Sequence, residues 1–273
     1  MEPTKKVILI TGASAGMGKE LAKDLLKDGH IVYGAARRLD KMNDIQKLGV
    51  KVIEMDVTDE ESMVRGIQTI QNAEGRIDIL INNAGFGSFG AIEEVSTVDA
   101  RYQLEVNVFG AARLMQLVIP GMRNQHYGRI INISSMGGKL VMPMAGWYHA
   151  SKYAIEAISD SLRNEVGQFG INVVVIEPGA VKSEWGDIAM DHLQNVSGKG
   201  AYSRLVTSLL KMNKDMANKL SEPGVISKLV RSAIASKKPK ARYAGGHMAK
   251  PFMFMRWLLP DNIFDKAIQS QLK

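Results

Sequence analysis

Residues 7–18 read VILITGASAGMG, an apolar run followed directly by a stretch of glycines and other small residues. Lys19–Ala22 then opens a segment with the apolar spacing of a helix, so the sequence predicts a strand, a tight turn and a helix N-terminus. Unpaired N–H groups and the helix dipole favour a pyrophosphate at such a terminus. The stretch therefore predicts the first strand and the phosphate-binding turn of a dinucleotide-binding sheet.

The three glycines of this stretch have different predicted roles. Gly12 supports the turn, Gly16 keeps the path of the phosphates free of a side chain, and Gly18 lets the helix pack close to the strand. The spacing differs from the G-x-G-x-x-G fingerprint, so the prediction depends on the strand before the turn and the helix after it. Ser14 and Met17, within the same turn, complete the predicted cofactor contacts of this stretch.

Apolar runs and segments of helical period alternate along the chain. The apolar runs are 7–10, 31–36, 50–55, 77–82, 129–134 and 171–177, and the helical segments are 16–28, 40–48, 59–73, 97–122, 148–168 and 222–236. Alternating strands and helices form a parallel sheet with helices on both faces, because each crossover is right-handed. The sequence predicts an α/β chain that forms a single-domain, doubly wound Rossmann fold over residues 1–273, with a parallel sheet of about seven strands.

Two segments fall outside this alternation. Residues 183–220 are rich in Met, Asn, Ser, Lys and Gly and lack a clear strand, which is more typical of a mobile lid over a pocket than of a core element. The tail, about residues 248–273, has apolar patches around Phe252, Phe254 and Trp257. Three placements of the tail are open: packing on the body, covering a partner subunit, or lying on a membrane surface, since it is too short to span a bilayer.

The composition argues against several classes of site. The chain has no Cys, and its five His residues include no pair at the helical spacing of metal ligands, so we expect no metal site. The formal net charge is +7, but the cations are scattered and aromatic residues do not interleave with them, so we expect no nucleic-acid partner. The apolar run near the N-terminus is too short for a signal peptide or a membrane span, which favours a cytoplasmic location.

Two arginines after the second predicted strand favour NADP(H) over NAD(H). At this strand end a dinucleotide site reads the adenosine ribose, with a carboxylate for a 2′-hydroxyl or a guanidinium for a 2′-phosphate. Ala36 occupies the place of the carboxylate, and Arg37 and Arg38 follow it. Asp40 is the acidic residue nearby, and its position before KMNDIQKL favours a helix N-cap over a ribose ligand.

The third predicted strand leads into Asp56 and Val57, which we expect to contact the cofactor. The Asp56 carboxylate has two open roles. It either accepts a hydrogen bond from the adenine amino group or caps the helix predicted at 59–73.

Residues 146–156 read GWYHASKYAIE and place Tyr148 and Lys152 four residues apart in a predicted helix. Positions four apart share a helix face. An ammonium near a phenol favours the phenolate, so we expect Lys152 to lower the pKa of Tyr148 towards the range of a proton donor and acceptor. Ser135 follows the strand predicted at 129–134, at the edge where open α/β sheets bind their ligands. The three residues predict a site for acid–base chemistry.

These residues resemble the classical short-chain dehydrogenases/reductases. The motifs TGASAGMG (11–18), NNAG (82–85), Ser135, YHASK (148–152) and PGAVKS (178–183) have that family's order and spacing, over about residues 5–245. The resemblance implies that Tyr148 exchanges a proton with the substrate oxygen, that Ser135 hydrogen-bonds this oxygen, and that Lys152 binds the nicotinamide ribose while tuning Tyr148. Asn107 matches the family's helix asparagine, which holds a water in a proton relay.

The resemblance also implies further cofactor contacts. Ala84 and Gly85 leave room for the adenosine ribose, and Asn83 is either a brace of the backbone or a cofactor ligand. The contacts implied around the nicotinamide and the pyrophosphate are Pro178, Gly179, Val181 and Ser183. Serine at position 183 differs from the family's commoner threonine but keeps the hydroxyl.

Apolar residues around the predicted catalytic group indicate the class of substrate. The expected pocket residues are Met136, Met142, Met144 and Trp185, with Leu140, Val141, Trp147, Ile188 and Met190 around them. Such a wall favours a lipophilic ketone, aldehyde or alcohol, and the chain is similar to the branch of retinol and hydroxysteroid dehydrogenases. The alternative is that many of the methionines fill the core under the lid.

We therefore expect an NADP(H)-dependent oxidoreductase that reduces a carbonyl group to an alcohol, or the reverse, by hydride transfer. Two alternatives are a catalytically silent NADP-binding sensor or scaffold and an isomerase that oxidises its substrate transiently. The helices predicted at 97–122 and 148–168 carry small and apolar residues on more than one face. The family pairs these two helices across an interface, which implies a homo-dimer or homo-tetramer, although burial within one chain explains the pattern almost as well.

Overall fold

Within residues 5–272, which the computed structural model describes, seven strands form one sheet in the order β3-β2-β1-β4-β5-β6-β7. Every neighbouring pair is parallel. The strands are β1 (Val7–Thr11), β2 (Ile31–Ala36), β3 (Lys51–Glu54), β4 (Ile79–Asn82), β5 (Gly128–Ile133), β6 (Ile171–Pro178) and β7 (Arg242–Gly245). The predicted doubly wound α/β fold is confirmed.

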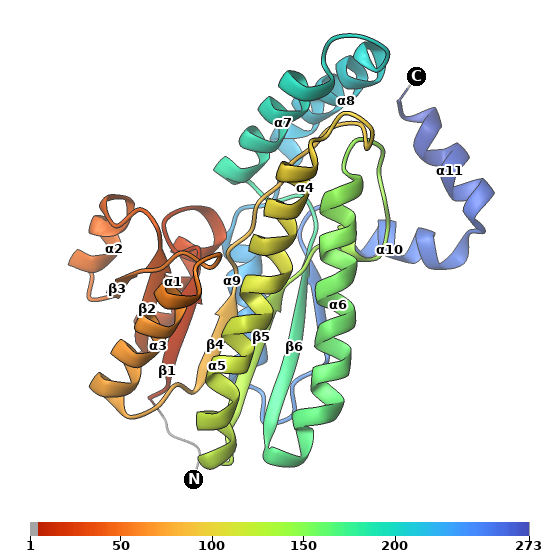
Figure 1. Cartoon of the computed structure of the whole chain (residues 1–273). Coiled ribbons are helices and arrows are strands. Elements are labelled where there is room, and N and C mark those ends of the chain that lie inside the picture. The colour runs from red at the N-terminus through yellow and green to blue at the C-terminus, as the bar shows by residue number, and fades with distance from the viewer. Residues whose placement is uncertain (1–4, 273) are drawn as a thin grey trace.

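Alternate residues of β1 supply two cores, one on each face of the sheet. Ile8 and Ile10 belong to one cluster, whereas Val7 and Leu9 belong to the other. Successive side chains of a strand point to opposite faces, so a short run of apolar residues serves both cores. The first face is covered by α1 (Gly16–Lys27), α2 (Asn43–Lys47) and α9 (Gly224–Ala235), and the second by α3 (Glu60–Glu74), α5 (Gly110–Asn124) and α6 (Gly146–Val166) (Figure 1).

The carboxyl ends of the strands meet at one edge of the sheet, and the predicted site residues follow them. The chain order reverses between β1 and β4, which is where open α/β sheets bind their ligands. The segments after β1, β4, β5 and β6 contain the motifs at 11–18, 82–85, 135 and 178–183. The topology therefore brings to one edge the motifs that lie far apart in the sequence.

Two predicted helices differ from the structure. The helix predicted at 97–122 consists of α4 (Thr97–Leu104), a π-helical turn at Glu105–Phe109, and α5. The helix predicted at 40–48 begins with a 3₁₀ turn, Asp40–Met42, and Leu39 takes its N-cap position. The N-cap prediction for Asp40 is wrong, because the backbone is already helical at Leu39, where φ is −62° and ψ is −39°.

The position of the seventh strand was not evident from the apolar runs. β7 is only four residues long, half-buried along its length, and contains Arg242. It lies at the edge of the sheet and pairs with β6 alone. A short edge strand buries too little apolar surface to produce an apolar run.

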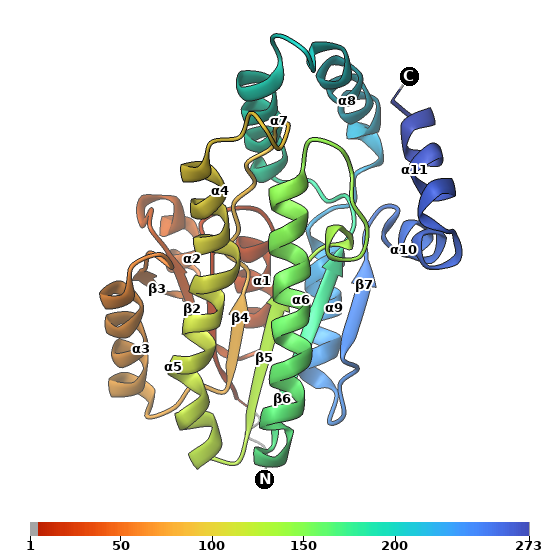
Figure 2. The ribbon, with the colours of Figure 1, turned by 45° about the vertical axis from the view of Figure 1, so that its right-hand side comes forward.

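The predicted lid is helical. It comprises α7 (Glu184–Ser197) and α8 (Ser203–Met216), which stand above the carboxyl ends of the strands at the top of Figures 1 and 2. Leu193, Val206 and Leu209 from these helices form a separate small core with Ala91 and Met144. The lid thus has its own apolar contacts, apart from the two sheet cores, while its mobility remains a prediction.

The tail forms two further helices, α10 (Ala249–Leu258) and α11 (Asp261–Ser270), beside the upper end of α6 (Figure 2). Phe264 and Ile268 are buried against Leu140, so this face of the tail packs on the body. On the outer face, Phe254 and Trp257 are 60% and 78% exposed. Within residues 5–272, no helix has the length and apolar character that a membrane crossing requires.

Candidate active site

The glycine-rich turn lies between β1 and α1, and its backbone explains two of its glycines. Gly12 and Gly16 have φ angles of 69° and 52°, in the left-handed region that favours glycine. At the N-terminus of α1, no side chain makes a capping hydrogen bond and the first turn contains no acidic residue. The N–H groups of this turn, which includes Met17, are therefore suited to an anion, and Ser14 is half-buried beside them.

Asn83 and Thr11 brace the turn from β4 and β1. Nδ2 of Asn83 donates to the carbonyl oxygens of Thr11 and Gly12 at 2.9 and 3.2 Å. Oγ1 of Thr11 accepts from the backbone N–H groups of Asn83 and Ala84 at 3.1 and 3.0 Å. A Cβ on Gly18 would overlap the Asn83 amide and the Gly12 carbonyl. This geometry favours the bracing role of Asn83 over that of a cofactor ligand.

The arginines at the end of β2 have different surroundings. Nη1 of Arg37 donates to the phenolic oxygen of Tyr102 at 2.7 Å and lies 3.9 Å from Oδ2 of Asp56. Arg38 is exposed. Arg37 is therefore directed across the carboxyl end of the sheet towards α4, whereas Arg38 faces solvent.

Asp56 closes a turn rather than capping α3. Its Oδ1 accepts from the backbone N–H and the hydroxyl of Thr58 at 2.9 and 2.8 Å. Asp59 is the N-cap of α3, so the capping role considered for Asp56 is wrong. The turn fits closely against α5, because a Cβ on Gly110 would overlap the Val57 carbonyl.

Ser135, Tyr148 and Lys152 come together at the carboxyl end of β5. The Ser135 hydroxyl accepts from the N–H of Gly137 at 3.0 Å and lies close enough to the Tyr148 phenol to influence its pKa. Nζ of Lys152, one turn after Tyr148 on α6, donates to the carbonyl of Ile133 at 2.9 Å. It lies 5.8 Å from the centroid of the Tyr148 ring. The structure thus gathers the residues that the sequence pattern predicted to act together.

Burial controls the pKa of both Tyr148 and Lys152. It raises the pKa of Tyr148 to about 12, and the nearby Ser135 hydroxyl acts in the opposite direction. It lowers the pKa of Lys152 to about 8, and the charge of Glu156 acts to raise it. The expectation that Lys152 lowers the Tyr148 pKa towards neutrality is wrong in this structure, because the loss of solvent dominates. Tyr148 is a neutral phenol at neutral pH.

Asn107 lies in the π-helical turn between α4 and α5, and such turns are frequent at functional sites. Its Oδ1 accepts from the N–H of Phe86 at 2.7 Å, and its Nδ2 donates to the carbonyl of Phe86 and to Oγ of Ser151 at 2.9 Å each. The amide therefore joins the loop after β4 to α6, the helix that carries Tyr148 and Lys152. Its role in a water relay remains a prediction from the family resemblance.

His149 is a site residue that the sequence analysis missed. Its Nε2 accepts from the N–H of Met142 at 2.9 Å, which leaves Nδ1 to donate to the carbonyl of Gly137, also at 2.9 Å. The neutral imidazole thus fastens both ends of the loop after Ser135 to α6. Its position next to Tyr148 was the available signal, but sequence does not show that a loop ten residues upstream folds over the ring.

The segment after β6 forms the opposite side of the site. A Cβ on Gly179, which follows Pro178, would overlap the carbonyl of His247, and Val181 makes a bridge with Ser221. Ser183 is the N-cap of α7 but makes no capping hydrogen bond, so its hydroxyl is uncommitted. Its Cβ lies 3.4 Å from the place of a Cβ on Gly16. The start of the lid therefore lies directly across the glycine-rich turn.

Aromatic rings, rather than the predicted methionines, surround Tyr148. The ring centroid of Trp185 lies 5.0 Å from that of Tyr148, and the centroid of Phe89 lies 5.6 Å from it. Sequence analysis predicted Trp185 but missed Phe89, which follows NNAG by only four residues. Met144 is buried in the lid core, while Met136 and Met142 pack under the tail. For these methionines the structure favours the core-filling alternative.

Comparisons with known proteins agree with this geometry. Residues 6–192 match the family model described as short chain dehydrogenase. The chain belongs to the classical short-chain dehydrogenase/reductase family. Over 271 residues, it is 34% identical to the 3-ketodihydrosphingosine reductase of Bacteroides thetaiotaomicron, with 98% of both chains covered.

Two further relatives extend over nearly the whole chain. This chain is 32% identical to the NADPH-dependent 3-dehydrocapnine reductase of Ornithobacterium rhinotracheale, and the match covers 97% of this chain and 96% of the reductase. The crystal structure of a short-chain dehydrogenase from Streptomyces avermitilis superposes with a TM-score of 0.81 at 32% identity, covering 98% and 97% of the two chains. The family match shows an oxidoreductase that uses a nicotinamide cofactor and acts on small molecules.

Proposed function

We propose that this short-chain dehydrogenase is an NADP(H)-dependent carbonyl reductase for lipophilic ketones or aldehydes. The observation that carries the proposal is the meeting of Ser135, Tyr148 and Lys152 at the carboxyl end of β5, where burial raises the pKa of the Tyr148 phenol to about 12. A reductase needs the protonated phenol, because the reduced carbonyl oxygen must receive a proton. The proposal therefore favours reduction over oxidation.

The residues of the glycine-rich turn and its surroundings fit a dinucleotide. The N-terminus of α1 would hold the pyrophosphate, and the uncommitted hydroxyl of Ser183 lies beside that turn. Arg37 and Arg38 would hold a 2′-phosphate, which supports NADP(H) over NAD(H). Further proposed cofactor contacts are Asp56, Val57, Ala84, Gly85, Lys152, Pro178, Gly179 and Val181. When bound, the cofactor supplies the hydride.

The chain's own residues control the substrate oxygen and its proton. Ser135 donates a hydrogen bond that polarises the carbonyl, and Tyr148 transfers its phenolic proton to the oxygen as the alcohol forms. The Lys152 ammonium, one turn away, stabilises the phenolate that remains. Asn107 holds the loop after β4 against this part of α6 through Ser151.

The surroundings of Tyr148 support a lipophilic substrate. The rings of Phe89 and Trp185 stand beside it and exclude water from the carbonyl. Two relatives similar along their whole length are named for the reduction of 3-ketodihydrosphingosine and of 3-dehydrocapnine. Both names describe a keto compound as the substrate, which makes 3-ketodihydrosphingosine a suitable first compound to assay.

The test is NADPH oxidation with 3-ketodihydrosphingosine and a panel of shorter ketones and aldehydes. We expect turnover, and we expect Tyr148→Phe to lower kcat by about 1,000-fold, the order of a lost general acid, with the circular dichroism spectrum unchanged. NADPH binding without turnover would identify a sensor, and a changed product without net NADPH oxidation would identify an isomerase. Wild-type rates in Tyr148→Phe would contradict the proposal.

The cofactor preference has its own test. We expect Arg37→Ala and Arg38→Ala each to lower the ratio of NADPH to NADH affinity by about 10-fold, the order of one charge-assisted contact. Arg101→Ala, which removes an arginine from α4, is the matched control. An unchanged ratio in both single variants and in the double variant would leave the NADP(H) preference without its proposed cause.

Assembly and location complete the proposal. Phe109, before α5, and Tyr153, on α6, are 57% and 42% exposed, which supports pairing of these helices in a homo-dimer or homo-tetramer. Sedimentation of the purified chain tests this directly. The cytoplasmic location stays a prediction from the sequence.

A further inference from the structure

The helix face that carries Tyr148 and Lys152 continues with two acidic residues. Glu156 and Asp160 follow Lys152 at the same spacing of four, so all four side chains share one face of α6. The Glu156 side chain is 5% exposed, whereas that of Asp160 is 43% exposed. Burying a carboxylate is costly unless partners compensate it, so the contacts of Glu156 require an explanation.

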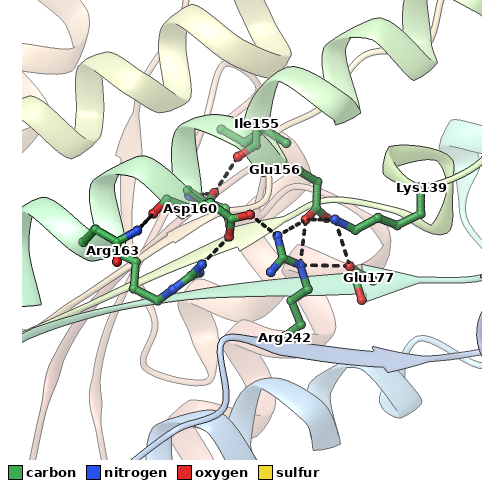
Figure 3. A network of polar contacts seen from close by, with 10 residues as sticks. Lys139, Ile155, Glu156, Asp160, Arg163, Glu177 and Arg242 are labelled. Atoms are coloured by element: carbon green, nitrogen blue, oxygen red, sulfur yellow. Dashed lines mark hydrogen bonds and ion pairs between the residues drawn. The ribbon is translucent and has the colours of Figure 1, made fainter.

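Glu156 is held by two cations from other elements (Figure 3). Its Oε2 accepts from Nε and Nη2 of Arg242 on β7 at 3.0 and 2.9 Å. It also lies 2.9 Å from Nζ of Lys139, which follows the turn after Ser135. Arg242 continues to Asp160, which in turn pairs with Arg163. The carboxylate therefore has a fixed position one turn from Lys152.

A second buried carboxyl group, Glu177 on β6, lies beside Glu156. It is 3.3 Å from Nε of Arg242 and 3.9 Å from Nζ of Lys139. Burial and the charge of Glu156 raise the pKa of Glu177 to about 7. Two cations, Lys139 and Arg242, and one further carboxyl group, Glu177, thus surround the Glu156 carboxyl group.

Lys152 lies one helix turn before Glu156 on α6. The Lys152 side chain is buried, and its ammonium donates to one backbone carbonyl, that of Ile133. Burial alone favours the neutral amine. Glu156 is buried on the same helix, one turn after Lys152, and its charge favours the ammonium. The other charged or titratable groups near this face are Tyr148 and Asp160 on α6, Lys139, Glu177 and Arg242.

We propose that Glu156 is a positioning residue that keeps Lys152 in its cationic form within the closed site, with Lys139 and Arg242 holding the Glu156 carboxylate in place. The inference rests on the proposed reductase function, in which the Lys152 ammonium stabilises the Tyr148 phenolate. A purely structural role for Glu156, tying β7 to α6, would affect stability without changing the protonation of Lys152.

The first test measures the pKa of Lys152 directly, without any turnover. In protein labelled at lysine ¹³Cε, the resonance of Lys152 is assigned with Lys152→Arg and titrated in wild type, Glu156→Gln and Asp160→Asn. We expect Glu156→Gln to lower the pKa of Lys152 by about one pH unit, the order of a lost neighbouring charge, and Asp160→Asn to leave it unchanged. An unchanged pKa in Glu156→Gln would overturn the proposal.

The second test follows NADPH-dependent ketone reduction against pH. Loss of the Lys152 proton occurs at lower pH in Glu156→Gln, so the alkaline decline of kcat should move down by a similar amount. At pH 8 we expect kcat to fall about fivefold while KM is unchanged, and at pH 6 we expect it to stay within twofold of wild type. A pKa that falls while the kcat profile stays in place would overturn the role in the reaction.

A third variant covers the case in which Glu156→Gln does not fold. Glu156→Asp keeps the charge but withdraws it by one methylene, so both shifts should be smaller and in the same direction. Unchanged values in folded Glu156→Asp, with Glu156→Gln unfolded, would identify a structural role only and overturn the proposal. A wild-type chain without turnover would contradict the proposed function, while the titration would still decide the coupling of Glu156 to Lys152.

Discussion

Gly18 in the glycine-rich turn is tightly packed, whereas Gly186 in the lid has open space around it. A Cβ on Gly18 would overlap the Asn83 amide and the Gly12 carbonyl, whereas a Cβ on Gly186 would have no neighbour within 4 Å. The turn is defined by backbone and amide atoms that have no room to shift. The lid is held by apolar side chains in a small core of its own, which includes Leu193 and Val206. One side of the site is therefore closely packed around its backbone, whereas the other side is the one that we predict to adapt to a substrate.

The largest effect is expected from Gly18→Ala. The added methyl forces the turn away from Asn83, so we expect NADPH affinity to fall by about 100-fold, which corresponds to the 1–3 kcal/mol typical of overpacking. Titration of the cofactor, followed by the quenching of tryptophan fluorescence, measures the change. Wild-type affinity in Gly18→Ala would show that the turn is not the rigid side.

A smaller effect is expected from Trp185→Ala in the lid. Removal of the indole exposes the Tyr148 ring to water and enlarges the substrate side, so we expect the KM of a lipophilic ketone to rise about 10-fold. NADPH affinity should stay within threefold of wild type. In Trp185→Phe, KM should lie much closer to the wild-type value than in Trp185→Ala. Steady-state kinetics with two ketones of different chain length give the comparison. A collapse of NADPH affinity would mean that the lid also shapes the cofactor site.

His149 predicts a dependence of stability on pH. Burial lowers its folded pKa below 6.5, and its bond to the Gly137 carbonyl acts in the opposite direction. The unfolded chain therefore binds a proton more readily, so stability is lost as pH falls below 6.5 through the folded pKa. We expect the loss to be about 1 kcal/mol, the order of the Met142 bond that a protonated ring cannot accept.

Urea unfolding of wild type and His149→Phe at several pH values checks this. At pH 8 the side chain at position 149 is uncharged in both proteins. The difference between their free energies of unfolding at this pH is therefore the reference value. The difference should narrow between pH 6.5 and pH 5. Parallel curves over this range would remove His149 as the cause.

The smallest effect is expected from Gly186→Ala, which is also the matched control for Gly18→Ala. The position is helical and open, so alanine should stabilise α7 by up to about 1 kcal/mol and leave NADPH affinity within twofold of wild type. Thermal unfolding and the same cofactor titration measure both values. A loss of affinity as large as that in Gly18→Ala would remove the distinction between the two sides.

Much of the fold follows from local patterns. The apolar runs located six strands, and the pattern of strand, glycines and helix at residues 7–18 identified the turn. The position of β7 was not predicted, because this half-buried edge strand contains Arg242 and has no apolar run. The lid helices were not predicted, because their apolar residues form a small separate core. The π-helical turn around Asn107 was not predicted either, because one extra residue per turn barely changes the helical period.

The residues of the candidate site were predictable to a similar degree. Ser135, Tyr148 and Lys152 follow from spacing and from the family's motifs, since positions four apart in a helix share a face whatever surrounds them. Phe89, His149 and Glu156 did not follow, because each acts through contacts with segments distant in the sequence. Spacing reveals which residues can meet, whereas long-range contacts decide what they meet.

The sequence by itself determined the sheet, its glycine-rich turn and the residues at the carboxyl ends of its strands. Local periodicity and glycine geometry are properties of short segments, which explains this reach. Only the tertiary structure decided that burial raises the pKa of Tyr148 to about 12, that the tail packs under Leu140, and that Glu156 lies between two cations beside Lys152. Loss of solvent and the field of distant charges depend on the whole packed chain, so no local pattern contains them.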